Sequence, residues 1–166
     1  MKPVCLVLGA GAGIGGTVAA KFAAEGYHAC LCRRSDQAGL DQMLKNIEAE
    51  GGTASGYLIN AIEENVLEEL IISIEKDHGP IEVLVYNLGA QSGMKLLHET
   101  SIKEFEWAWR IADLGLFRVA KTLMPLMEQR GSGTLLVNSA TAAIRGNKNQ
   151  HTHSTALGGR RMLCQT

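Results

Sequence analysis

The sequence predicts an α/β fold in which helices cover both faces of a doubly wound parallel sheet of about five strands. Short apolar segments alternate along the chain with longer segments of helical periodicity, and this alternation is typical of a parallel sheet. The chain has 166 residues, about the size of one domain, and contains no linker or low-complexity segment. We therefore expect a single domain over residues 1–166.

The first strand and the first helix are predicted by two different periodicities. The run Val4–Leu8 is apolar throughout, as expected for a strand that is buried on both faces. In residues 13–25 the side chains of Ile14, Val18 and Phe22 lie four residues apart, with alanines between them. This spacing predicts a helix that packs closely on the sheet.

The second strand is expected over residues 28–32, and a weaker third strand over residues 53–59. Ser35 or Asp36 is expected to cap the helix between them, because short polar side chains satisfy the free N–H groups at a helix start. An apolar stripe with helical spacing indicates the face that this helix buries. The stripe consists of Leu40, Met43, Leu44 and Ile47.

The remaining elements continue the alternation. A third helix is expected over residues 63–77, where apolar side chains gather on one face. The strongly apolar run 81–86 predicts the fourth strand. A long helix follows over about residues 101–129, and residues 133–137 begin a fifth strand.

The composition excludes several classes of protein. Hydrophobic residues make up 46% and charged residues 20% of the chain, which is enough to bury a core. The formal net charge is −1, so nucleic acid is not expected as a partner. No apolar run approaches the roughly 18 residues that span a bilayer, so no membrane association is expected. The cysteines form no Cys-x-x-Cys pair, which favours a reducing, cytoplasmic location. They are Cys5, Cys30, Cys32 and Cys164.

A glycine-rich segment directly follows the first predicted strand. It reads Gly-Ala-Gly-Ala-Gly-Ile-Gly over residues 9–15 and opens the first predicted helix. The N–H groups at a helix start attract a pyrophosphate, and only glycine lets the backbone come so near. We therefore predict dinucleotide binding over the alternative of a tight turn without a ligand. The expected cofactor-binding residues are Gly9, Gly11, Gly13, Ile14 and Gly15.

The end of the second strand indicates which dinucleotide is bound. Enzymes that bind NAD place an acidic residue there to accept hydrogen bonds from the ribose hydroxyls. This chain has Arg33 and Arg34 instead, with Asp36 beyond them. A guanidinium offers both charge and a planar fork of donors to a 2′-phosphate. We therefore expect NADP(H) rather than NAD(H), the alternative being a solvated arginine pair.

With these motifs, the sequence resembles the short-chain dehydrogenase/reductase family. The family's Thr-Gly-x-x-x-Gly-x-Gly corresponds to residues 8–15, with Leu8 in place of threonine, and its Asn-Asn-Ala-Gly corresponds to Tyr86-Asn87-Leu88-Gly89. The resemblance runs from about residue 3 to the C-terminus. It implies a Rossmann-type fold and hydride transfer between NADP(H) and a carbonyl or secondary alcohol.

The resemblance implies further residues of the cofactor pocket. The family places an acid that hydrogen-bonds the adenine after the third strand, where this chain has Asn60, followed by Ala61. An amide can still hydrogen-bond an adenine edge. Asn87, Leu88 and Gly89 are expected to line the pocket after the fourth strand.

The family's catalytic side chains are missing from the positions that the resemblance gives them. His153 stands at the position of the tyrosine acid and Leu157 at that of the lysine, which lowers the pKa of the tyrosine. Ala140 replaces the serine, and Ala112 replaces the asparagine. Histidine ionises near neutral pH, so His153 is the one candidate for a replacement acid. The alternative is a solvated histidine in a polar segment.

Three further sequence features have less specific interpretations. Ser139 and Thr141 flank the missing serine and could offer a hydroxyl. Trp107 and Trp109, near Phe105, are expected to pack in the core or between helices, the alternative being an oligomer interface. The pair His151 and His153 has no third ligand at suitable spacing, so no metal site is expected.

Three functions remain open on the sequence alone. The chain is an NADP-dependent oxidoreductase with impaired catalysis that acts on a small carbonyl or alcohol. Alternatively, it is an inactive nucleotide-binding pseudo-enzyme, either a homo-oligomer or paired with a full-length relative. The third alternative is a non-functional fragment, since relatives of this family continue beyond the helix in which the chain ends.

Overall fold

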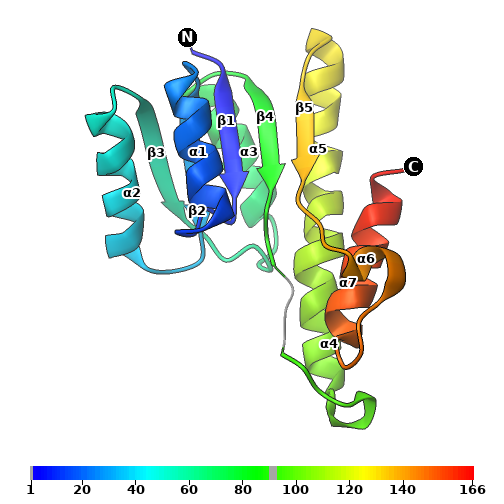
Figure 1. Ribbon diagram of the computed structural model, residues 1–166. Helices are drawn as coiled ribbons and strands as arrows, with labels where there is room; N and C mark the ends of the chain where they lie inside the picture. The colour runs from blue at the N-terminus through cyan, green and yellow to red at the C-terminus, as the bar shows by residue number, and fades with distance from the viewer. Residues whose placement is uncertain (1, 90–92) are drawn as a thin grey trace.

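The computed structural model describes residues 2–89 and 93–166. Its five strands form one parallel sheet in the order β3-β2-β1-β4-β5, as Figure 1 shows. The strand order reverses between β1 and β4, and in such sheets ligands bind beyond the carboxyl ends of the strands at this point. The predicted doubly wound parallel sheet is confirmed. The strands are β1 (Val4–Leu8), β2 (His28–Arg33), β3 (Thr53–Leu58), β4 (Ile81–Tyr86) and β5 (Thr134–Val137).

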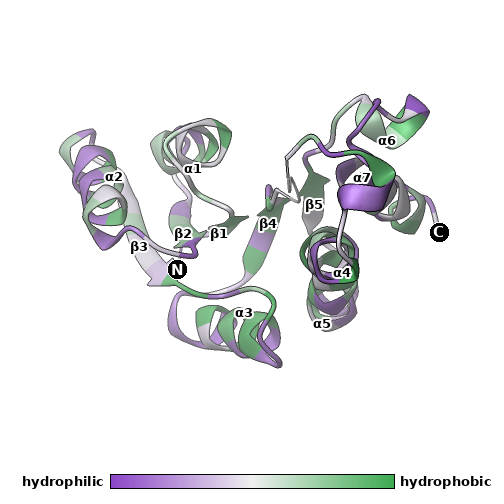
Figure 2. Ribbon diagram, turned by 90° about the horizontal axis from the view of Figure 1, so that it is seen from below, coloured by the Kyte–Doolittle hydropathy of each residue, from purple (hydrophilic) through white to green (hydrophobic). Residues whose placement is uncertain are grey.

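Helices cover both faces of the sheet (Figure 2). Helices α1 (Ile14–Ala24) and α2 (Gln37–Ala49) pack on one face, and α3 (Val66–Asp77) and α5 (Gly115–Arg130) pack on the other. Each face has its own apolar core, because successive side chains of a strand point to opposite faces. In β1, for example, Leu6 belongs to the core under α3 and α5, whereas Val7 belongs to the core under α1 and α2.

The predicted long helix contains an irregular turn at its centre. Helix α4 (Ile102–Trp109) continues through a π-helical segment, Arg110–Leu114, into α5. The buried Tyr86 hydroxyl donates a hydrogen bond to the carbonyl of Ile111 in this segment. Gly115 makes room for that contact, since a Cβ there would lie 2.3 Å from the Tyr86 hydroxyl oxygen. Tyr86 therefore fills the space between β4 and the long helix.

The C-terminal part of the chain lies beside the long helix. A 3-10 turn, η1 (Leu97–Glu99), precedes α4, and two helices, α6 (Ala142–Arg145) and α7 (His151–Leu163), follow β5. Helix α7 packs against α4 and α6 and brings its inner face to the carboxyl ends of β4 and β5. Among the described helices, none is both long and apolar enough to cross a membrane.

The structure corrects the predicted buried face of α1. Its buried residues are Gly15, Ala19 and Ala23, while Ile14 is 61% exposed and Val18 and Phe22 are only partly buried. The small residues let the helix backbone approach β1 and β2 closely, which larger side chains at these positions would prevent. Spacing alone favoured the larger apolar side chains because they have more surface to bury.

Two other predictions need correction. The third helix begins at Val66, three residues later than expected, because Asn65 adopts a left-handed conformation with φ 61° that a helix cannot contain. Trp109 and Phe105 are not core residues, since their side chains are 43% and 44% exposed. Only Trp107 packs inward, against the small cluster between α4 and α7.

Candidate nucleotide-binding and catalytic site

The glycines of residues 9–15 have two different structural roles. Gly9 adopts φ +93°, and a Cβ there would lie 2.6 Å from the Asn87 carbonyl oxygen. A Cβ on Gly15 would lie 2.2 Å from the carbonyl oxygen of Gly9. By contrast, a Cβ on Gly11 or Gly13 would meet no described atom within 4 Å. Gly9 thus lets the loop lie against the backbone that follows β4, Gly15 lets α1 lie against the loop, and Gly11 and Gly13 border open space.

The start of α1 fits an anionic ligand. The helix has no side-chain cap and no acidic residue in its first turn, and the Gly16 N–H donates to the Gly11 carbonyl at 2.8 Å. The N–H groups of Ile14 and Gly15 and the positive end of the helix dipole are therefore left to meet an anion. A pyrophosphate that approaches Gly11 and Gly13 would occupy this position without steric hindrance from a side chain. The residues present therefore fit the dinucleotide that the sequence predicts.

Asn87 connects the glycine loop with the ends of two strands. Its side-chain amide donates to the Gly9 carbonyl at 2.9 Å, and its Oδ1 accepts from the Asn138 amide at 2.7 Å. Its own N–H donates to the carbonyl of Leu8 at the end of β1. One side chain thus fixes the loop after β1 relative to the residues after β4 and β5.

A cavity of about 260 Å³ opens at the carboxyl ends of the strands beside this loop. It brings together seven of the twelve residues predicted to bind the cofactor, which are Gly9, Arg33, Arg34, Asn60, Ala61, Leu88 and Gly89. Trp107 and Ile111 of the long helix close the cavity. Local sequence patterns do not indicate that role, because both residues follow the end of β4 by more than 20 positions.

The two arginines at the end of β2 differ in their partners. Arg33 forms an ion pair with Asp36 at 2.9 Å, and its side chain is only 18% exposed. Asp36 caps α2 at the same time by accepting from the Gly39 N–H at 2.9 Å, as predicted for this residue. Arg34 is exposed and has no ion pair among the residues that the structure describes. Its guanidinium is therefore the one of the two that is free to meet a phosphate.

The residues predicted to contact the adenine are partly committed elsewhere. The Asn60 side-chain N–H donates to the Glu63 carboxylate at 2.9 Å, which leaves the side-chain carbonyl oxygen of Asn60 for another partner. The carbonyl of the buried Ala61 accepts from Arg118 at 3.4 Å, and Arg118 also forms an ion pair with Glu68 at 2.6 Å. This pair lowers the pKa of Glu68 through the hydrogen bonds from the guanidinium. Arg118 thus connects α5 both to α3 and to the loop after β3.

A second cavity, of about 190 Å³, contains most of the positions that the family uses for catalysis. Ala140, His153 and Leu157 all line it, together with Asn87, Leu88 and Gly89, and the last two also line the first cavity. Ala112 lies beside Leu157 in a fully buried apolar cluster. The four positions predicted to be catalytic therefore lie close together, and three of them carry apolar side chains.

Two of the polar residues that line the second cavity, His153 and Ser139, could act on a substrate. The Nδ1 atom of His153 is buried and has no hydrogen-bond partner among the described residues. Ser139 contributes a side chain to the lining, while Thr141 does not belong to the residues found there. His151 lies outside this cavity and hydrogen-bonds Thr100 at 2.6 Å.

Arg160, which no sequence pattern indicated, is a buried cation in the wall of the second cavity. Its side chain donates to the carbonyl of Leu88 at 2.9 Å and to that of Asn138 at 2.6 Å. The guanidinium also lies over the Tyr86 ring, 5.8 Å from its centroid. Burial lowers the pKa of Arg160, yet a guanidinium stays charged. Arg160 thus joins α7 to the ends of β4 and β5, and its sequence context offered no signal for this.

Replacing Arg160 with leucine should lower the free energy of unfolding by about 2–4 kcal/mol, because two buried carbonyls lose charged donors. Unfolding in urea measures this loss. Arg161→Leu is the matched control, since the next residue is exposed, and it should change the free energy by less than about 0.5 kcal/mol. Equal effects of the two substitutions would contradict the anchoring role.

Known proteins share this fold. A crystal structure of a short-chain dehydrogenase from Rhodopseudomonas palustris is 29% identical, with a TM-score of 0.92 over 98% of this chain and 76% of that one. A metagenomic short-chain oxidoreductase solved in complex with NADP has a TM-score of 0.93 over 98% of this chain and 73% of that one, at 22% identity. The second similarity, at this low identity, shows the fold alone.

Sequence comparison places the chain in one family. The 3-oxoacyl-[acyl-carrier-protein] reductase FabG of Thermotoga maritima is 27% identical over 158 residues, which are 94% of this chain. The chain spans 63% of the length of that reductase. The family model described as short chain dehydrogenase matches residues 3–166. This protein therefore belongs to the short-chain dehydrogenase/reductase family of oxidoreductases.

Proposed function

We propose that this chain binds NADP(H) and carries the framework of a carbonyl reductase or secondary-alcohol dehydrogenase with strongly impaired catalysis. The observation that carries the binding proposal is the open space at Gly11 and Gly13, at the uncapped start of α1. The pyrophosphate would lie there, and the adenosine part would enter the cavity lined by Asn60 and Ala61.

The preference for NADP(H) rests on the end of β2. Arg34, which is free, would hold the 2′-phosphate directly. Arg33 adds positive charge, although its ion pair with Asp36 holds the side chain toward α2. No described side chain at the end of β2 offers the carboxylate that an unphosphorylated ribose would need, except Asp36, which already caps α2.

The proposed reaction depends on what the second cavity can supply. A nicotinamide cofactor, when bound, provides the hydride, and the protein must orient the substrate and provide a proton. His153 would donate the proton to the substrate oxygen, and Ser139, which also lines the cavity, would offer a hydroxyl. Leu157 and Ala140 offer neither charge nor a hydrogen bond to that oxygen. We therefore infer that hydride transfer is slow.

A second candidate function follows from the same cavity. Apolar residues at Ala112, Ala140 and Leu157 suit a protein that binds the nucleotide without turnover and acts by pairing with a full-length relative. The exposed Phe105 and Trp109 on α4 would be available to such a partner. Measured turnover separates the two candidates.

NADPH should bind more tightly than NADH by about 1–3 kcal/mol, as expected for a charge-assisted contact to the 2′-phosphate. Fluorescence titration of both cofactors measures the difference. Arg34→Ala should remove most of this preference, and Arg33→Ala should remove less. Lys45→Ala, an exposed cation on α2 that does not line the first cavity, should leave the preference unchanged. Equal affinity of the unmodified chain for both cofactors would contradict the arginine assignment.

A further inference from the structure

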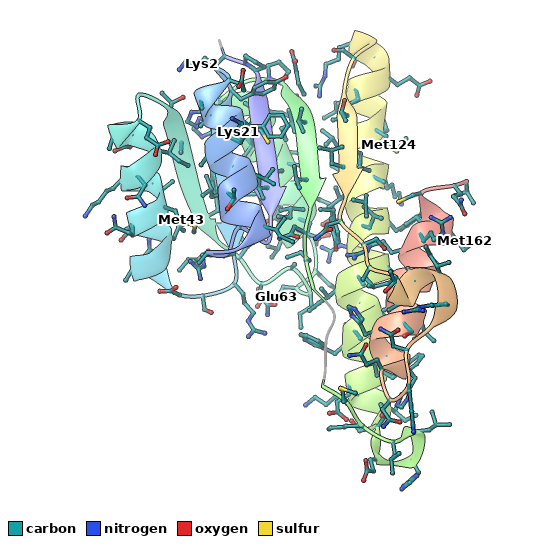
Figure 3. The ribbon with its side chains drawn as sticks, viewed as in Figure 1. Lys2, Lys21, Met43, Glu63, Met124 and Met162 are labelled. Carbon is teal, nitrogen blue, oxygen red and sulfur yellow. The ribbon has the colours of Figure 1, made fainter. Side chains whose placement is uncertain are left out.

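Three side chains that can bind metals lie together at the amino ends of the strands, whereas the glycine loop lies at their carboxyl ends. His28 begins β2, Cys30 follows on the same face of that strand, and His78 caps the end of α3. One potential ligand atom from each lies within 4.8 Å of the others. Figure 3 shows Lys2 at the amino ends of the strands and Glu63 at their carboxyl ends. The first cavity opens at the carboxyl ends. The cluster is therefore separate from the proposed cofactor site.

Two hydroxyl groups of β3 surround the cluster. The Tyr57 hydroxyl lies 2.8 Å from Nε2 of His78. The Ser55 hydroxyl lies 3.0 Å from Nε2 of His28. Polar groups that hydrogen-bond the ligand residues are typical of metal sites, where they fix the orientation of the imidazoles.

The donor atoms of the cluster indicate which metals would bind. A metal ion that binds Cys30 must displace the thiol proton, because the thiolate is the form that coordinates metals. This requirement favours a metal with high affinity for thiolate over one that prefers oxygen.

We propose that His28, Cys30 and His78 form a zinc-binding site. One sulfur and two imidazole nitrogens are a donor set typical of zinc, which takes four ligands and often leaves the fourth position to water. At zinc bond lengths of about 2.0–2.3 Å, tetrahedral ligand atoms lie about 3.5 Å apart, so the side chains must close in on the ion. The His28 and His78 rings are stacked, with their centroids 4.5 Å apart, so both imidazoles must also rotate to direct a nitrogen at it. His28 and His78 are only half-buried, which gives them room to move and gives the ion a route from solvent.

The proposal is tested by titrating the purified full chain with Zn²⁺ in competition with a coloured chelator, and with Co²⁺ as a spectroscopic probe. We expect one ion per chain, a thiolate-to-cobalt absorption band and a raised melting temperature. Cys30→Ala should abolish the band and the stoichiometric uptake. Cys5→Ala is the matched control, because Cys5 is also fully buried but lies outside the cluster, and it should retain both.

A second pair of variants distinguishes loss of the metal site from a folding defect. His78→Gln replaces a half-buried ligand and should weaken zinc binding at least tenfold, whereas His98→Gln replaces an exposed histidine outside the cluster and should not. Uptake of less than one zinc ion by the unmodified chain would overturn the proposal. So would a cobalt band that survives both Cys30→Ala and His78→Gln. None of these measurements depends on whether NADPH binds.

Discussion

With NADPH and generic carbonyl substrates, turnover by this chain is expected to stay below about 0.01 per second, a thousandth of the typical enzyme rate of about 10 per second. The hydride acceptor becomes an oxyanion that needs a proton, and the positions of the family's acid, lysine and serine hold His153, Leu157 and Ala140. The catalytic rate falls by many orders of magnitude when groups that act as a unit are lost together. NADPH oxidation in the presence of a panel of aldehydes and ketones measures the rate.

Restoring the family's side chains should raise this rate by at least about 100-fold. The combined variant carries Ala112→Asn, Ala140→Ser, His153→Tyr and Leu157→Lys. Leu157→Lys alone should gain nothing, because it places a second cation in the cavity wall that already contains Arg160. If His153 supplies the proton in the unmodified chain, His153→Ala should abolish the residual rate. Fast turnover that survives His153→Ala would contradict our assignment of the catalytic positions.

Gly15→Ala is expected mainly to lower the stability of the fold, whereas Gly13→Leu is expected mainly to prevent NADPH binding. Gly15→Ala should lower the free energy of unfolding by about 3 kcal/mol or more, because the new Cβ would lie 2.2 Å from the Gly9 carbonyl oxygen and 2.9 Å from the Ala10 Cα, both of which are backbone atoms. Gly13→Leu should cost no more than about 1 kcal/mol, because a Cβ there meets open space. It should nevertheless abolish NADPH binding.

Unfolding in urea and fluorescence titration with NADPH, carried out on both variants, separate the two effects. Gly26→Ala serves as a control, because it is distant from the loop and its Cβ would also meet open space, although its φ of +95° makes a moderate loss of stability expected. Its affinity for NADPH should not change. Unaltered NADPH binding by Gly13→Leu would contradict the position proposed for the pyrophosphate.

The sequence determined the sheet and the glycine loop because both depend on local patterns. The strands Val4–Leu8 and Ile81–Tyr86 have the bounds predicted from their apolar runs, since strands buried on both faces are nearly continuous apolar segments, interrupted in the second one by the partly buried Glu82. The cap of α2 at Asp36 and the glycines of residues 9–15 are local signals of the same kind. Convergence of Asn60 and Gly89 on one cavity followed from the parallel sheet, whose strands all end at one edge.

Only the tertiary structure decided which side chains meet across that framework. It paired Arg118 with Glu68, 50 residues away, and it placed Arg160 against the carbonyls of Leu88 and Asn138. It also brought His78 to His28 and Cys30, about 50 residues earlier in the chain. The physical reason is that charge and hydrogen-bonding capacity are properties of a residue, which the sequence states. Burial and partners depend instead on strand order and helix packing, which bring together segments that no local pattern connects.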